Sequence, residues 1–412
     1  MEPIANTSDS IREGNTTSFV KTLFNTLIAV TGIGILSIPY ALASGGWLSL
    51  LFFFLISIGA CYGGLLTQRC METNPNIKTF SDIGQHAYGK MGERILLGIL
   101  YVDLYLVLTG FLILEGDNLY SLFPEMKIEL FSLLISSGKS CFVIVVALVI
   151  LPSVWVDDLR LLAYISSAGV MSSFVLIVSV LWVAVFDNVG FHHKGEVVRW
   201  KGFPTALSLY MFSFGANPVF PSLYTSMRTK YQFFKVLVIS FVIATFGYAT
   251  MGILGYMMYG STLNSQITLN LPKEHLGSKI AIYIAWITPL TKYALLMKPV
   301  ATTTEAWLPH RYQERRLVKI ILTTLLVTSQ VILGLSVPFF GDLMSLVGAL
   351  CSATASITAP CVCYMRISRI ERKSIEGVVI MVLIALSILL VVAGTYTALD
   401  NLVKNVCIRK HH

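Results

Sequence analysis

Two short stretches of the sequence place glycine and proline beside polar side chains inside long apolar runs. The first is residues 30–40, VTGIGILSIPY, and the second is residues 213–221, SFGANPVFP. Glycine costs about 1 kcal/mol and proline about 3 kcal/mol in a helix interior, so each stretch predicts a helix that stops and restarts. A helix that begins inside a membrane presents free N–H groups, and one that ends there presents free C=O groups. Such a pair of breaks predicts a binding site, made mainly of backbone, for a small molecule with one charge of each sign.

An amino acid fits this chemistry because its backbone carries a carboxylate and an ammonium group. We expect the carboxylate at the N–H groups of residues 34–36, and the ammonium at carbonyls of residues 29–30 and 211–213. Glycine lets a ligand approach the backbone closely, and hydroxyl or amide side chains could help, although Ser and Thr often bond their own backbone. The predicted substrate-binding residues are Thr31, Gly32, Ile33, Gly34, Ile35, Ser213, Phe214, Gly215, Asn217 and Tyr105.

Three ionisable side chains lie inside other apolar segments, where a charge costs at least about 2.5 kcal/mol and needs a partner or a task. They are Asp103, Lys292 and Lys298, and all three are candidates for coupling the binding of the small molecule to an ion. Lys292 lies near the middle of its segment, where a fixed cation could replace a bound metal ion or carry a proton. Asp103 and Lys298 are expected at similar depths and could form a buried ion pair; a structural interhelical bond is the alternative for each. Glu115 lies towards the end of its segment, which favours solvation at the interface.

The composition requires that the elements holding these residues lie in a lipid bilayer. Of 412 residues, 55% are hydrophobic and only 13% are charged, with a mean hydropathy of +0.74. This is too apolar for a soluble globule. The sequence predicts an all-α polytopic membrane protein with eleven transmembrane helices, of which helices 1 and 6 are broken. The apolar runs are approximately 19–43, 47–69, 95–118, 140–156, 160–186, 204–227, 233–259, 279–307, 317–336, 338–365 and 375–400.

The two broken helices stand five apart, as expected if helices 1–5 and 6–10 form an inverted repeat whose halves meet at the bilayer midplane. An excess of Lys and Arg on one side of the predicted helices favours a cytoplasmic N-terminus. The predicted organisation is a short cytoplasmic tail (1–17), a transporter domain (18–400) with repeat one at about 18–186, repeat two at about 204–365 and an eleventh helix at 375–400, and a short non-cytoplasmic tail (401–412).

Other functional classes lack their characteristic residues. The sequence has no H-E-x-x-H or G-x-S-x-G motif, so we expect no enzyme, no metal and no other cofactor. The formal charge of +8 is scattered over the ends of the apolar runs rather than gathered on one face, so nucleic acid is not an expected partner. The expected partners are the lipid bilayer and a small-molecule substrate.

Short motifs are spread over nearly the whole chain. They are Asn25 with GIGILSIPYA at 32–41, GGW at 45–47, SDIG at 81–84, AYG at 87–89, GY at 255–256, YG at 259–260 and TKYA at 291–294. These motifs resemble those of the amino acid/auxin permease (AAAP) family, and within it the vacuolar amino acid transporter (AVT-type) branch of plants and fungi. The resemblance implies a LeuT/APC-like fold, a 5+5 inverted repeat plus an extra helix 11, and amino acid transport driven by protons or sodium. Sodium-coupled relatives carry asparagine three residues after the position of Asn25, where this chain has Ile28, so the resemblance favours protons.

These observations predict a secondary active transporter of neutral amino acids, coupled to protons, that works by alternating access around a midplane site at the broken helices. A carrier of auxin or another small carboxylic acid is one alternative. A sensor that binds an amino acid without net transport is another. The resemblance places the protein first in the vacuolar membrane and second in the plasma membrane.

Overall fold

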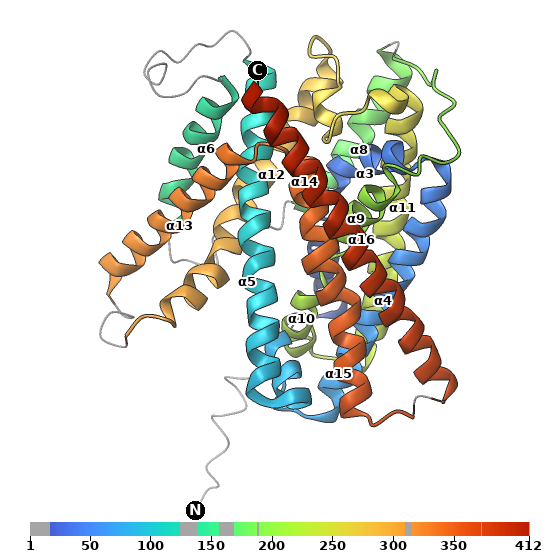
Figure 1. The fold of residues 1–412 in the computed structure, drawn as a ribbon, viewed down its shortest axis with the longest axis vertical. Coiled ribbons are helices and arrows are strands. Elements are labelled where there is room, and N and C mark those ends of the chain that lie inside the picture. Colours follow the sequence, from blue (N-terminus) through green and yellow to red (C-terminus); the bar gives the residue numbers. More distant parts are fainter. Residues whose placement is uncertain are drawn as a thin grey trace, which may run out of the picture.

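The computed structural model describes residues 17–123, 138–155, 169–187, 189–309, 315–371 and 373–411. Within these ranges the regular structure is helical, apart from one isolated backbone bridge between Thr17 and Met227 (Figure 1). The α-helices are α2 (Phe19–Val30), α3 (Gly34–Gly45), α4 (Trp47–Thr73), α5 (Phe80–Leu122), α6 (Gly138–Val154), α8 (Gly169–Phe186), α9 (Phe203–Ser213), α10 (Phe220–Ser226), α11 (Phe233–Tyr259), α12 (Leu276–Glu305), α13 (Arg316–Ser336), α14 (Phe340–Val347), α15 (Ala359–Ile367) and α16 (Ile375–His411).

The described helices include seven candidate spans that are long and apolar enough to cross a membrane, and the bent pair α2 and α3 makes an eighth candidate. Two further apolar helices, α6 and α8, are shorter. The predicted all-α polytopic membrane architecture is therefore confirmed. The count of eleven helices and the inverted repeat stay predictions.

Both predicted breaks are present. In the first broken helix, α2 ends at Val30, α3 begins at Gly34, and the two axes differ by 49°. In the second broken helix, α9 ends at Ser213, and a 3-10 turn at Asn217–Val219 leads into α10. These boundaries follow the glycines and prolines, which hold a helix poorly.

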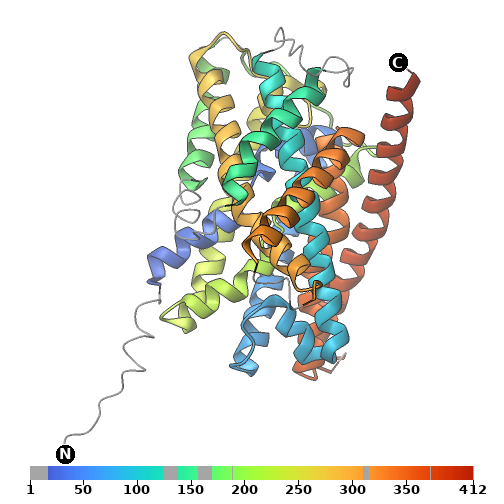
Figure 2. The same cartoon turned by 90° about the vertical axis from the view of Figure 1, so that its left-hand side faces the viewer.

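The two broken helices lie at the centre of the bundle. α3 packs against α9 and α11, α2 packs against α11, and α9 also contacts α14. In contrast, α16 crosses the outside of the bundle in Figure 1 and lies at one edge of it in Figure 2. The breaks are thus enclosed by other helices, where free backbone groups can be satisfied by protein rather than exposed to lipid.

Three local features go beyond the predicted helix boundaries. α5 begins at Phe80, well before the predicted residue 95, and contains a non-helical residue, Gly89, with φ 67°. Two π-helical turns, Gly348–Ser352 and Thr354–Thr358, separate α14 from α15. α16 continues to His411, through residues that were expected to form a tail.

Candidate functional site

At the first break, the end of α2 is capped by hydrogen bonds from Thr31, the residue that follows it. The Thr31 N–H donates to the Leu27 carbonyl at 2.7 Å, and the Thr31 hydroxyl donates to the same carbonyl at 2.6 Å. Thr31 therefore uses its hydroxyl to cap α2, as Ser and Thr often do in membrane helices. The next residue, Gly32, donates its N–H to the Val30 carbonyl at 3.1 Å and to the Tyr248 hydroxyl at 3.0 Å.

The start of α3 presents backbone N–H groups without a cap. Its N-cap residue is Ile33, which offers no side-chain acceptor. The N–H groups of Gly34 and Ile35 donate to no side chain or loop carbonyl among the described residues. Free N–H groups at a helix start attract anions because the helix dipole adds its positive end there. This is the geometry expected for a carboxylate-binding site.

The end of α9 lies directly against the start of α3. The Ser213 hydroxyl donates to the Leu209 carbonyl of its own helix at 2.9 Å. A Cβ atom added to Gly34 would lie only 2.5 Å from Ser213 Oγ. Gly34 thus permits the close packing of α3 on α9, which is a structural reason for a glycine here in addition to the predicted approach of a ligand.

The second break is tied to the π-helical turns that follow α14. A Cβ atom on Gly215 would lie 2.9 Å from Ser352 Oγ, and the Ser356 hydroxyl lies 3.5 Å from the Phe214 carbonyl. Asn217 is fully buried, and its amide donates to the Ser356 carbonyl at 2.6 Å and to the Ala60 carbonyl of α4 at 3.1 Å. Asn217 therefore holds the second broken helix between two neighbours.

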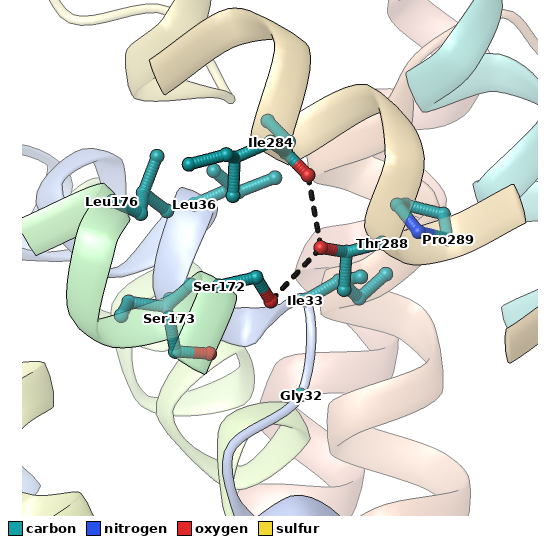
Figure 3. A pocket seen from close by; sticks show the side chains of 11 residues that line it. Gly32, Ile33, Leu36, Ser172, Ser173, Leu176, Ile284, Thr288 and Pro289 are labelled. Atoms are coloured by element: carbon teal, nitrogen blue, oxygen red, sulfur yellow. Dashed lines mark hydrogen bonds between the residues drawn. The ribbon is translucent and has the colours of Figure 1, made fainter. Parts of the chain in front are cut away.

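A small cavity lies beside the first break (Figure 3). Its interior offers only about 20 Å³ to the centre of a water-sized sphere, which is room for about one water molecule. The helices around the break are therefore closely packed in this conformation. The Thr288 hydroxyl lies in its wall, between Ser172 Oγ at 3.0 Å and the Ile284 carbonyl at 2.9 Å. Its lining residues are Gly32, Ile33, Ile35 and Leu36 from the first broken helix, Ser172, Ser173 and Leu176 from α8, and Ile284, Ala285, Thr288 and Pro289 from α12.

Gly32 differs from the other two predicted glycines in what surrounds it. A Cβ atom added to Gly32 would meet nothing within 4 Å, whereas Gly34 and Gly215 are tightly packed. Gly32 also lines the cavity. Of the three, it is the glycine at which open space reaches the backbone.

Lys292 of α12 reaches the first break. Its side chain is 8% exposed, and Nζ lies 3.5 Å from the Thr31 carbonyl oxygen. The ammonium group is therefore placed where the interrupted helix leaves a carbonyl. The Lys292 side chain is thus within reach of the broken backbone, and its role in ion coupling stays a prediction.

No ion pair among the described residues joins Asp103 to Lys292 or to Lys298. Asp103 Oδ1 is buried and accepts no hydrogen bond from any described residue. An Asp103–Lys298 pair is not among the ion pairs of the described residues. The suggested pairing of these two side chains is therefore not seen.

Tyr105 and Glu115, both on α5, have surroundings that the sequence did not indicate. The Tyr105 hydroxyl is hydrogen bonded to Ser329 of α13 at 2.7 Å, so it is engaged outside the two breaks. Glu115 is fully buried, and neither of its carboxyl oxygens has a hydrogen-bond partner among the described residues. The expected solvation of Glu115 at the interface is wrong, because its face of α5 is covered by other helices.

Sequence reasoning missed Tyr248, which contributes the main side-chain contact to the first break. Its hydroxyl accepts from the Gly32 N–H and donates to the Val30 carbonyl at 2.8 Å. It also missed Ser352 and Ser356, which contact the second break. The serines lie on π-helical turns, which frequently occur at functional sites, but such turns depend on packing and leave no simple sequence signal.

Comparison with known proteins places these features in a wider context. Residues 15–399 match the family model described as transmembrane amino acid transporter protein. The amino acid transporter AVT1I of Arabidopsis thaliana is 47% identical over 390 residues, which cover 94% of this chain and 96% of that protein. AVT1J of the same plant is 47% identical over 392 residues, covering 95% and 92%.

Among solved structures, the crystal structure of MhsT in complex with L-phenylalanine is similar in fold. The TM-score is 0.54 at 11% sequence identity, over 92% of this chain and 98% of that chain. This likeness confirms the predicted LeuT-like fold and, at such low identity, concerns the fold alone. The relatives are named transporters, not enzymes. Together with the family match across residues 15–399, they show that this chain belongs to the transmembrane amino acid transporter (AAAP) family, in its AVT-type branch.

Proposed function

We propose that this protein is a proton-coupled secondary transporter of neutral amino acids, which works by alternating access around the two breaks. The observation that carries the proposal is the meeting of two interrupted helices, where the uncapped start of α3 faces the end of α9. The substrate carboxylate binds the N–H groups at the start of α3, and the ammonium binds carbonyls at the helix ends beside it, such as that of Ser213 at the end of α9. Since both contacts use backbone, the site recognises what all amino acids share.

The substrate class is supported by the relatives, which are named amino acid transporters. The MhsT structure is a complex with L-phenylalanine, a ligand of the same class. Neutral substrates are favoured because the lining of the cavity beside the first break has no charged side chain among its residues. We place the protein in the vacuolar membrane, on the strength of its resemblance to that branch of the family.

Proton coupling is supported by the position of Lys292. A cation fixed 3.5 Å from the Thr31 carbonyl takes the place that a metal ion would need at the broken backbone. Movement of the first broken helix would change the contact between this ammonium group and the carbonyl. Binding and release of a proton at Lys292 would then be linked to the conformation of the break.

The test uses purified protein in liposomes without sodium. An imposed pH gradient should drive accumulation of neutral amino acids, and absence of gradient-dependent flux across an amino acid panel would refute the proposal. Binding without flux would favour the sensor alternative, and uptake of simple carboxylic acids in place of amino acids would favour the second carrier alternative.

The role of Lys292 is tested by Lys292→Met, which replaces the side chain by an unbranched one that is only one atom shorter and removes the charge. This variant should lose accumulation driven by the pH gradient and retain exchange of labelled for unlabelled substrate. Lys279→Met, at an exposed position of the same helix, is the matched control and should accumulate substrate normally. Normal pH-driven accumulation by Lys292→Met would exclude Lys292 as the proton carrier.

A further inference from the structure

The hydroxyl of Tyr248 lies between the two broken helices. Tyr248 belongs to α11, and its side chain is only 1% exposed. The hydroxyl accepts from the Gly32 N–H at 3.0 Å, donates to the Val30 carbonyl at 2.8 Å, and lies 3.5 Å from the Ser213 carbonyl. One side-chain atom therefore contacts backbone groups of both breaks.

The Tyr248 hydroxyl lies close to more carbonyls than it can donate to. A phenol has a single proton to donate, and here it lies close to two carbonyls, those of Val30 and Ser213. The shorter distance assigns the proton to Val30. The Ser213 carbonyl, at the end of α9, is left with a weak contact, and an additional donor would satisfy it.

The missing donor has the chemistry of an ammonium group. An ammonium carries three N–H bonds and a positive charge, which suits carbonyls at the end of a helix. A carboxylic acid without an amino group would bring no such donor. Its binding would bury the Ser213 carbonyl without a partner, and such a mismatch lowers affinity by about tenfold or more.

We propose that Tyr248 is a positioning residue that holds the two breaks together and leaves the Ser213 carbonyl open to the substrate ammonium, and so selects amino acids over acids that lack an amino group. This inference rests on the proposed function, because it assumes that the substrate binds at the breaks. The hydroxyl keeps the Gly32 N–H and the Val30 carbonyl paired while the helix is interrupted. Without the hydroxyl, the Gly32 N–H and the Val30 carbonyl would keep only their 3.1 Å hydrogen bond with each other, and the binding geometry would be populated less often.

The test compares Tyr248→Phe with a matched loss of another buried hydroxyl. Tyr248→Phe retains the ring and its edge contact with Phe214, whose centroid is 5.6 Å away, and removes only the oxygen. We expect KM for uptake to rise about tenfold or more, equally for amino acids with different side chains, because the lost contacts are to backbone. The control is Tyr210→Phe: Tyr210 is fully buried and its hydroxyl bonds to Ser49 at 2.9 Å, so KM should stay at the wild-type value.

The selectivity for alanine over propionate provides a second measurement, which would not change if Tyr248 had only a structural role. In wild-type protein, propionate should compete poorly with labelled alanine. In Tyr248→Phe the difference in affinity between alanine and propionate should narrow. A KM within twofold of wild type together with unchanged selectivity would overturn the proposal, and so would an equal rise of KM in Tyr210→Phe.

Two further measurements test the role of Tyr248 even if the variant folds poorly or if the protein does not transport amino acids. If Tyr248→Phe yields too little folded protein, Gly32→Pro is compared with Gly32→Ala: both add atoms at the same position, but only proline removes the N–H that the hydroxyl accepts. An equal KM in these two variants contradicts the inference. Uptake by wild-type protein tests the proposed function by itself. If wild type binds amino acids without moving them, the shift in unfolding temperature caused by alanine should be smaller in Tyr248→Phe, and an equal shift overturns the role of Tyr248.

Discussion

Substitution of Gly34 by alanine tests how closely the two broken helices are packed. The new Cβ atom would lie 2.5 Å from Ser213 Oγ and 2.9 Å from Ser213 Cα, whereas ordinary contacts begin at 3.4 Å. The shortfall is about 0.9 Å at the hydroxyl and about 0.5 Å at the backbone atom. Rotation of the Ser213 side chain can relieve only the first of these. To relieve the contact with Ser213 Cα, α3 and α9 must move apart. Overpacking of this kind costs about 1–3 kcal/mol.

Thermal unfolding of purified protein in detergent measures this cost, and uptake into liposomes measures its effect on function. Gly34→Ala should unfold at a lower temperature and transport more slowly, because the Ser213 carbonyl moves away from the first break. The double variant Gly34→Ala/Ser213→Gly removes the Oγ and Cβ contacts and should recover part of the stability. It cannot recover all of it, since the contact with Ser213 Cα remains.

Gly32→Ala is the matched comparison within the same break. Its Cβ would meet no atom within 4 Å, so the unfolding temperature should stay at the wild-type value while the methyl group reduces substrate affinity. The reasoning is refuted if Gly34→Ala is as stable as wild type, or if Gly32→Ala is the more destabilised of the two.

Three further substitutions test single contacts by thermal unfolding. Asn217→Ala should destabilise the protein by about 1–3 kcal/mol, because two buried carbonyls lose the donor that joins the second broken helix to its neighbours; wild-type stability would contradict this. Glu115→Met should leave stability unchanged or raise it, because the buried carboxyl has no partner among the described residues, and a large loss would show a missing partner. Arg69→Ala should cost under about 1 kcal/mol, because its 2.5 Å ion pair with Glu376 is substantially exposed; a larger loss would give that pair a structural role.

The breaks were predictable from sequence because their cause is local. Glycine and proline disfavour a helix wherever they stand, and an apolar run identifies the helix that they interrupt. The stretches 30–40 and 213–221 therefore located both breaks to within a few residues. The sequence also singled out Lys292 as a residue that needs a partner, because a lysine in the middle of an apolar run is costly and therefore rare.

Tyr248 was not predictable because its role depends on a contact between residues 216 positions apart. It is one of 18 tyrosines, and nothing in its neighbours along the chain separates it from the others. The glycines show a second limit. The sequence cannot distinguish a glycine that faces open space, such as Gly32, from one that faces a neighbouring helix, such as Gly34, because both simply lack a side chain.

The backbone bridge at Thr17 has a mechanical consequence for the two broken helices. The Thr17 N–H donates to the Ser226 carbonyl at 2.8 Å, and the Arg228 N–H donates to the Thr17 carbonyl at 3.1 Å. α2 starts two residues after Thr17, α10 ends at Ser226, and the two helices also touch. α2 and α10 are therefore joined to each other at the ends that lie away from the breaks. Any movement of one half-helix must carry the other with it, or the two hydrogen bonds of the bridge must first break.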